Sequence, residues 1–227
     1  MSDPRTVLAY AGVSALGLCV GSFLNVVAYR LPRECMSVAG PRSRCPRCAR
    51  FIAWYDNLPV LSWLLLRARC RHCGKGIPAR YPLVEAGTAA LFVATAAWTL
   101  PRAAFADPLA HGADWGVAGA RFLVTAALIA LALIDYDWEI LPDQITLGGL
   151  ALAPILVFAA PSLQPTPVID DWTIGGRVVG EVLGPRWTAV VHGLLGAAAC
   201  GGFLWTVGFL GSLAFRKEAM GLGDVKM

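Results

Sequence analysis

The chain has 227 residues, of which 57% are hydrophobic and 15% are charged, and its mean hydropathy is +0.60. Because a soluble domain carries about 25% charged residues, this composition excludes an ordinary soluble globular protein. The chain contains apolar runs of about 20 residues, long enough to cross a bilayer, and in lipid such runs can satisfy their backbone hydrogen bonds only as helices. We therefore predict an all-α polytopic membrane protein, a helical bundle. The candidate spans are Val7–Tyr29, Leu83–Leu100, Ala118–Tyr136, Gln144–Pro161 and Trp187–Leu213.

The net charge of +4 hides an asymmetry along the chain. Residues 30–80 hold 11 basic and 2 acidic residues, which leaves 8 basic and 13 acidic residues elsewhere. Short basic segments beside membrane helices stay in the cytoplasm, so we predict a cytoplasmic 30–80 segment and an outer N-terminus. Alternation then places 137–143 and 214–226 inside. This rule explains the basic segment, so we predict no nucleic-acid partner.

Small and polar residues lie together late in the first apolar run, at Gly21, Ser22 and Asn25. They favour close packing against a neighbouring helix with interhelical hydrogen bonds; contact with a ligand is the alternative. Near the start of the second run, Glu85 either favours the helix dipole or faces an active cavity.

Two Cys-x-x-Cys motifs, 21 residues apart, occupy the basic segment: Cys45, Cys48, Cys70 and Cys73. Each motif brings two thiolates to one side of a turn, and two motifs complete a closed tetrahedron around zinc. Such a site has no open position, so the zinc is predicted to be structural. Disulfides are the alternative, but the predicted cytoplasmic location is reducing.

Between the two motifs, Phe51–Leu66 is apolar but too short and too interrupted to cross a bilayer. Its aromatic residues Trp54, Tyr55 and Trp63 prefer the headgroup level. The stretch therefore lies in the membrane interface, where it docks the zinc domain, or it forms a small soluble core.

Four carboxylates follow the third apolar run within nine residues: Asp135, Asp137, Glu139 and Asp143. Carboxylates at a bilayer boundary are costly and indicate function. Asp137 and Glu139 are most simply solvated loop charges, and Asp143 is most simply the N-cap of the next helix. Asp135 is last on the apolar side. A further acid, Asp224, ends the sequence Gly221-Leu222-Gly223-Asp224 on the same predicted side.

We predict that Asp135 and Asp224 meet and share one proton, because two close carboxylates cannot both ionise readily. One then activates a water molecule, and the other polarises a peptide carbonyl, as in aspartic proteases. Two alternatives stay open: a carboxylate-relay transporter, and a non-catalytic zinc-bearing scaffold of a pilus or secretion machine.

Motifs along most of the chain resemble the bifunctional prepilin peptidase family, whose members are membrane aspartic peptidases of the Gly-x-Gly-Asp type. The motifs are Gly21-Ser22-Phe23-Leu24-Asn25, Tyr29-Arg30-Leu31-Pro32, the two cysteine motifs, Trp54-Tyr55-Asp56-Asn57-Leu58-Pro59, Arg80-Tyr81-Pro82-Leu83-Val84-Glu85, Ile134-Asp135, Leu141-Pro142-Asp143 and Gly221-Leu222-Gly223-Asp224-Val225-Lys226.

The resemblance implies that Asp135 and Asp224 are the catalytic pair. It implies cleavage of the basic leader of type IV prepilins or pseudopilins at the cytoplasmic face of the bacterial inner membrane, where the protein lies among lipids with several spans. It also implies N-methylation of the new N-terminus with S-adenosylmethionine. We expect a first helix over 1–29, a cytoplasmic zinc-knuckle domain over 30–82 between the first two membrane helices, and a peptidase domain over 83–227. No motif indicates the methyl-donor site, the oligomeric state, or whether pilus or type II secretion substrates are served.

The chain departs from the family pattern in two places. Members usually have eight membrane helices, so we expect a chain ending at Met227 to be inactive or poorly folded by itself. Many members also have glycine where this chain has Ala68.

Overall fold

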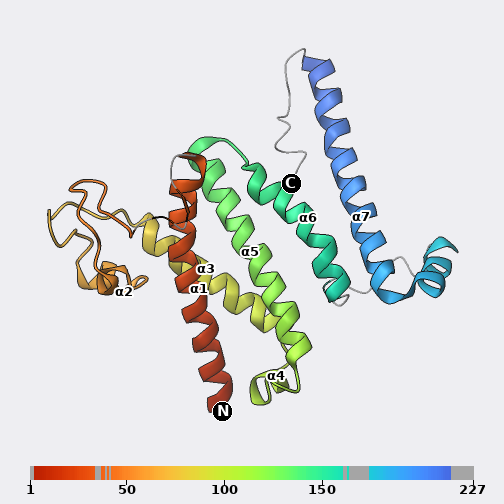
Figure 1. The fold of residues 1–227 in the computed structure, drawn as a ribbon, viewed down its shortest axis with the longest axis horizontal. Coiled ribbons are helices and arrows are strands. Elements are labelled where there is room, and N and C mark those ends of the chain that lie inside the picture. Colours follow the sequence, from red (N-terminus) through yellow and green to blue (C-terminus); the bar gives the residue numbers. More distant parts are fainter. Residues whose placement is uncertain are drawn as a thin grey trace. The chain divides into compact units, whose positions relative to one another are not determined.

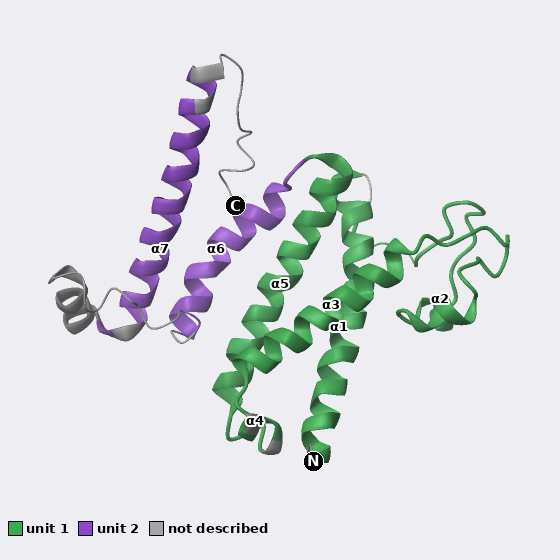
Figure 2. Cartoon of the chain, turned by 180° about the vertical axis from the view of Figure 1, so that it is seen from behind, with its two compact units in different colours: residues 1–139 green, residues 140–227 purple. Residues whose placement is uncertain are grey.

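The computed structural model describes residues 3–33, 37–38, 40, 42–160, 163 and 174–215. These residues are mostly helical, and none of them forms a strand. The chain divides into two compact units, residues 1–139 and 140–227, which are drawn in separate colours in Figure 2. Each unit is described by itself.

Three long helices form most of the first unit: α1 (Pro4–Arg30), α3 (Arg80–Thr99) and α5 (Gly112–Trp138) (Figure 1). Short helical elements lie between them: η1 (Leu31–Arg33), η2 (Trp54–Asn57), α2 (Leu61–Leu65) and α4 (Arg102–Ala106). The N-cap of α1 is Asp3, whose carboxylate accepts a hydrogen bond from the Arg5 N–H, and a proline follows it at the first helical position. Both features favour helix initiation.

Glycines let α1 approach α3 closely. A Cβ atom at Gly17 would lie 2.5 Å from Ala89 Cα, and one at Gly21 would lie 2.7 Å from Glu85 Cα. The Asn25 side-chain amide donates to the carbonyl oxygens of Gly21 and Tyr81, at 3.2 and 3.3 Å. The small and polar residues of the first run therefore serve helix packing, as predicted, since interfaces between apolar helices depend on close backbone approach.

An aromatic cluster fills the other end of this unit. Phe92 of α3 stacks on Phe122 of α5, with ring centroids 4.6 Å apart. Phe105 of α4 contacts Tyr10 of α1 and Trp115 of α5, at 4.7 and 5.8 Å between centroids. The segment between α3 and α5 therefore packs into the core of the unit.

The second unit consists of α6 (Asp143–Ala159) and α7 (Ile174–Phe215). Pro154 lies inside α6, where it removes one backbone hydrogen bond. Gly184 interrupts α7 with a non-helical backbone at φ 73° and ψ 166°. After this break the Trp187 ring packs edge-on against Phe158 of α6, with centroids 5.1 Å apart.

All five predicted spans are helical, but they differ in length and apolarity. Three helices of the described chain are long and apolar enough to cross a membrane: Pro4–Arg33, Gly112–Trp138 and Arg186–Leu210. They correspond to the first, third and fifth predicted spans. α6 is apolar but shorter, with 17 residues, and α3 has 20 residues without belonging to this set. The length and apolar composition of these helices thus indicate a membrane protein.

Candidate functional site

The four cysteines of the two motifs come together although they are far apart in sequence. The sulfur atoms of Cys45, Cys48, Cys70 and Cys73 all lie within 4.8 Å of one another. Sγ of Cys45 is 3.9 Å from Sγ of Cys73, far beyond the roughly 2.05 Å of a disulfide. All four are free cysteines, so the disulfide alternative is wrong. Four thiolates around zinc, each about 2.3 Å from the ion, lie about 3.8 Å apart, so the cluster can hold a metal ion.

A structural repeat builds this cluster, and the sequence analysis missed it. We call residues 42–78 the cysteine module. Each cysteine in its second half lies 25 residues after its equivalent in the first half (70 minus 45). Three backbone hydrogen bonds fold the first half: Ala49 N–H to Cys45 O, Cys45 N–H to Arg50 O and Ile52 N–H to Ser43 O. The three equivalent bonds fold the second half: Gly74 N–H to Cys70 O, Cys70 N–H to Lys75 O and Ile77 N–H to Ala68 O. Isolated bridges, Arg44 with Phe51 and Arg69 with Gly76, complete the match.

Left-handed backbone follows the second cysteine of each motif. Gly74 has φ +66°, and its equivalent Ala49 has φ +56°. Ala68 also has φ +58°, just before the second motif. Because this region favours glycine, the structure explains why glycine suits position 68.

Crowding affects the ionisation of the thiols. A hydrogen bond from the backbone N–H of Cys48 outweighs burial and lowers the pKa of Cys45 to about 7. A hydrogen bond from the backbone N–H of Lys75 lowers the pKa of Cys73. Burial and the neighbouring thiols together have a larger, opposite effect, and the pKa is raised to about 11. Four thiolates repel one another unless a cation lies between them, so this site favours a bound metal.

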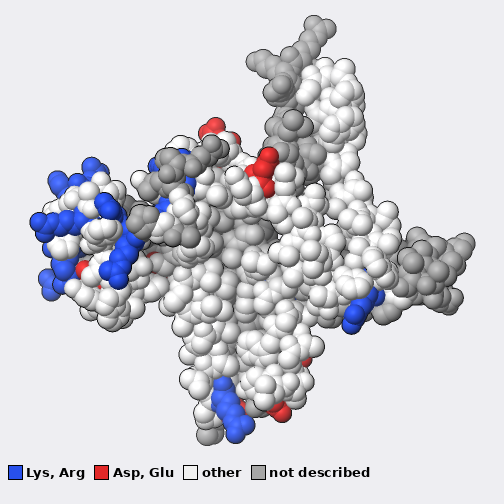
Figure 3. All heavy atoms as spheres, viewed as in Figure 1, with Lys and Arg blue, Asp and Glu red and all other residues white. Residues whose placement is uncertain are grey.

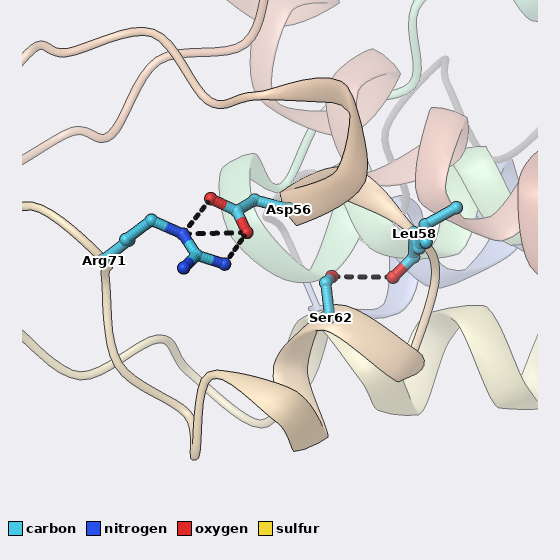
Figure 4. A network of polar contacts seen from close by, with 4 residues as sticks. All are labelled: Asp56, Leu58, Ser62 and Arg71. Carbon is cyan, nitrogen blue, oxygen red and sulfur yellow. Dashed lines mark hydrogen bonds and ion pairs between the residues drawn. The ribbon is translucent and has the colours of Figure 1, made fainter.

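An ion pair fixes the segment between the two motifs to the second motif (Figure 4). Arg71 donates from Nε and Nη2 to the carboxylate of Asp56, at 2.8 and 2.6 Å. The Asp56 side chain is only 8% exposed, and these hydrogen bonds with the guanidinium lower the pKa of its carboxyl group. Nearby, the Ser62 hydroxyl donates to Leu58 O at 2.6 Å. Ser62 is the only buried residue between positions 51 and 66, so the structure shows no apolar core in this segment.

Glu85 joins the cysteine module to the long helices. Its carboxylate accepts a hydrogen bond of 2.7 Å from the backbone N–H of Val60, which lies just before α2. The Ser22 side chain of α1 also hydrogen-bonds to it. Val60 has φ +59°, an unusual value for a β-branched residue, so this bond holds a costly backbone geometry. The carboxylate links three elements, which sequence alone did not reveal.

Two arginines contact the last turn of α5, next to Asp135. Arg80, at the start of α3, forms an ion pair of 2.6 Å with Asp137. Arg33, just after α1, lies over the Trp138 ring at 4.8 Å. α5 ends at Trp138, and its C-cap Glu139 has left-handed backbone at φ 53° and donates its N–H to Asp135 O. The simple reading of Asp137 as a solvated loop charge is therefore wrong.

The candidate acids differ in what the structure describes. Asp135 lies in the last turn of α5, and its side chain is exposed. Asp143 is the first residue of α6, and Pro142 takes the N-cap position, so the N-cap prediction for Asp143 is wrong. Asp224 lies outside the described residues. The predicted pair of Asp135 and Asp224 thus stays a prediction.

Comparison with known proteins identifies relatives of the whole chain. Residues 15–99 match the bacterial peptidase A24 N-terminal domain. A prepilin leader peptidase/N-methyltransferase of Myxococcus xanthus is 41% identical over 92% of this chain, which spans 51% of that relative. One of Pseudomonas putida is 36% identical over 99% of this chain, which spans 72% of that relative.

An Escherichia coli relative, a type 4 prepilin-like proteins leader peptide-processing enzyme, is 35% identical over 96% of this chain and 72% of its own length. No solved structure matches. The chain thus spans about half of the Myxococcus relative and about seven-tenths of the other two. Identity above 30% across nearly the whole chain establishes common descent, and the chain belongs to the prepilin leader peptidase/N-methyltransferase family.

Proposed function

We propose that the protein removes the leader peptide of type IV prepilins or pseudopilins and N-methylates the new N-terminus. The observation that carries this proposal is the sequence similarity to proteins named for these two activities. The alignments cover 92% and 99% of the chain. The described helices and the cysteine cluster agree with such a membrane enzyme. The proposal includes the organisation predicted from sequence: a first membrane helix over 1–29, a zinc domain over 30–82 and a peptidase domain over 83–227.

In this proposal Asp135 and Asp224 form the catalytic pair. Asp135 is exposed at the end of an apolar helix, where a carboxylate is reachable from the membrane boundary. Sharing one proton lets one carboxylate act as base toward water while the other donates to the scissile carbonyl. Peptide hydrolysis by this route needs no covalent intermediate with the enzyme.

The substrate class suits this location. A prepilin presents a basic leader followed by an apolar helix, so its cleavage site lies at the membrane boundary. We propose that this boundary is the cytoplasmic face of the bacterial inner membrane, where the basic segment of residues 30–80 also lies according to the positive-inside rule.

Zinc and S-adenosylmethionine are the proposed cofactors. Cys45, Cys48, Cys70 and Cys73 would hold the zinc ion, and four sulfur ligands leave it no open position for catalysis. Its role would be to hold the two halves of the cysteine module together. S-adenosylmethionine would supply the methyl group, and its site is not assigned to residues.

The test uses the complete protein in proteoliposomes with a prepilin substrate, followed by mass spectrometry of the pilin. We expect wild type to release the leader and, when S-adenosylmethionine is present, to yield a product one methyl group heavier. Asp135→Asn and Asp224→Asn each keep the side-chain shape but remove the ionisable group. Each is expected to slow cleavage by about 100- to 10,000-fold, the usual contribution of general acid–base catalysis.

Leader-free pilin serves as the second substrate, because it separates methylation from cleavage. Both variants should still methylate it, which also shows that they are folded. Normal cleavage by either variant would contradict the proposed pair. Absence of any cleavage by wild type would overturn the proposed peptidase function.

A shared proton also predicts a bell-shaped pH profile for cleavage. Its two apparent pKa values would belong to the pair rather than to either acid. A rate that does not fall on the acidic side would contradict proton sharing between Asp135 and Asp224.

A further inference from the structure

One face of α2 is apolar and exposed. Leu61, Leu64 and Leu65 follow one another at helical spacing and are 51%, 58% and 71% exposed. The opposite side is anchored to the cysteine module, because Ser62 is buried and the Trp63 indole N–H donates to Ile77 O at 3.0 Å. The leucines thus point away from the module because their neighbours fix the helix.

The preceding element η2 adds an exposed aromatic residue. Trp54 is 75% exposed, and its ring lies edge-on to Tyr55 at 5.7 Å between centroids. The Ser62 N–H donates to Leu58 O, which ties the two short helices together through the chain between them. We call Leu61, Leu64 and Leu65 the apolar face of the module.

Positive charge accompanies this face. Arg67 and Arg69 follow α2 directly, and both side chains are exposed. Figure 3 shows lysine and arginine side chains gathered over the part of the molecule that carries α2. Exposed leucine and tryptophan side chains next to arginines are typical of surfaces that bind anionic lipids. The apolar side chains enter the boundary between headgroups and acyl chains, while the arginines pair with the lipid phosphates.

The attachment of the module keeps such a surface within reach. α1 is long and apolar enough to cross a membrane, and it ends at Arg30, shortly before the module begins. Glu85 of α3 accepts a hydrogen bond from Val60 of the module and is also bonded to Ser22 of α1. Asn25 of α1 bonds Tyr81, which lies just after the module at the start of α3. Ser22 and Asn25 lie in the second half of α1, so the module is held beside the membrane surface that this helix leaves.

We propose that the apolar face of the module inserts into the headgroup region of a membrane containing anionic lipids, with Arg67 and Arg69 on the lipid phosphates. This inference depends on α1 crossing a membrane and not on the proposed enzymatic activities. Insertion would then fix the distance of the module from the membrane surface.

The test uses the complete protein with the photoreactive residue p-benzoyl-phenylalanine in place of Leu64, in nanodiscs of phosphatidylethanolamine and phosphatidylglycerol. Illumination followed by mass spectrometry is expected to give a lipid adduct at position 64, and the yield should rise several-fold with the phosphatidylglycerol fraction. The same label at Leu16, an exposed residue within the membrane helix α1, is the positive control. The label at Lys75, an exposed residue of the second cysteine motif, is the negative control.

Charge variants test the arginines separately from the leucines. Arg67→Gln with Arg69→Gln should remove the dependence on phosphatidylglycerol, whereas Arg42→Gln with Arg47→Gln, an equal loss of charge in the first half, should keep it. Zinc content checks that each variant retains the module. A covalent dimer, a crosslink within the chain, or equal lipid adducts at 64 and 75 would each overturn the proposal.

Discussion

The cysteine module and the long helices of the first unit hold together in different ways. Within residues 42–78 no residue other than Cys45 and Ser62 is buried as a whole, and the contacts are backbone hydrogen bonds, the ion pair of Asp56 with Arg71, and four thiols. The long helices instead bury aromatic side chains and bring backbones together at glycines. A segment of under 40 residues without an apolar core needs a metal or another constraint. A metal held by the four thiols would therefore stabilise the module as close packing stabilises the helices.

Removal of a metal bound to the four cysteines should have the largest effect, because it should unfold the module and leave the long helices folded. We expect chelation, or Cys70→Ser, to unfold the module while α1, α3 and α5 stay folded, because structural zinc supplies about 10–16 kcal/mol in small zinc domains. Hydrogen exchange at the backbone amides of Cys45, Ala49, Cys70 and Gly74 measures the loss. Cys19→Ser, on α1 outside the cluster, is the matched control. Unchanged protection of these amides after metal removal would contradict the account.

The helices should respond instead to added volume. Gly17→Ala and Gly21→Ala place a Cβ atom against the backbone of α3, and we expect each to lower the free energy of unfolding by about 1–3 kcal/mol. Gly12→Ala is the control on the same helix, because nothing lies within 4 Å of its added Cβ. Thermal unfolding in detergent, with zinc content measured in parallel, compares them. Equal stability of the three variants would show that the close approach of α1 and α3 is unimportant.

The ion pair between Arg80 of α3 and Asp137 of α5 fixes the last turn of α5, so its loss should affect the placement of Asp135. Asp137→Asn is expected to lower the kcat for prepilin cleavage several-fold, while stability changes by less than about 1 kcal/mol, as is usual for an exposed pair. The exchange Arg80→Asp with Asp137→Arg should restore part of the rate. Asp114→Asn, which breaks the ion pair with His111 at the other end of α5, is the control and should leave the kcat unchanged. A lack of rescue would assign the loss to Asp137 itself.

Acid should weaken the module by protonating Asp56, in addition to protonating the thiolate ligands of a bound metal. The pKa of Asp56 is lowered in the folded module, so the stability from its pairing with Arg71 is present above the ordinary pKa of about 3.9. It is lost as the pH falls through the lowered value. Asp56→Asn should therefore reduce the stability of the module at neutral pH and flatten its dependence on acid pH. Hydrogen exchange of the module at several pH values measures this, and the same acid dependence in variant and wild type would exclude Asp56 as its source.

The smallest effect should come from the left-handed positions of the module. Ala68→Gly and Ala49→Gly remove the strain of a side chain at positive φ and should each stabilise the module by about 1 kcal/mol. Gly74→Ala should destabilise it by a similar amount. Gly76→Ala, whose backbone is not left-handed, should have little effect. Midpoints of chelator-induced unfolding rank the four variants.

Sequence predicted the helices and the cysteine cluster because each has a strong local signal. Apolar runs of membrane length and paired Cys-x-x-Cys motifs depend on composition and spacing alone. The repeat of the module has a short sequence signal, Arg-Cys-x-x-Cys-x-x-x-Ile at 44–52 and 69–77, but the backbone hydrogen bonds that its two halves share are apparent only in the structure. The pairing of Asp137 with Arg80 was missed because it joins residues 57 positions apart, and nothing in a single sequence marks such a partner.

The proposed catalytic acids are predicted less completely. Asp135 was chosen because it ends an apolar helix, and the structure puts it there with an exposed side chain. Asp143 was given a capping role from its place after proline, but the backbone of Pro142 already takes the N-cap position. Asp143 is thus the first residue of α6 rather than its N-cap.

The most direct test compares these two acids in the complete protein. Asp135→Asn and Asp143→Asn would be assayed for prepilin cleavage and, separately, for methylation of leader-free pilin by mass spectrometry. The account predicts that Asp135→Asn loses at least about 100-fold in cleavage and still methylates, whereas Asp143→Asn cleaves within a few-fold of wild type. Normal cleavage by Asp135→Asn, together with loss of cleavage in Asp143→Asn, would contradict the assignment and make Asp143 the partner to test with Asp224.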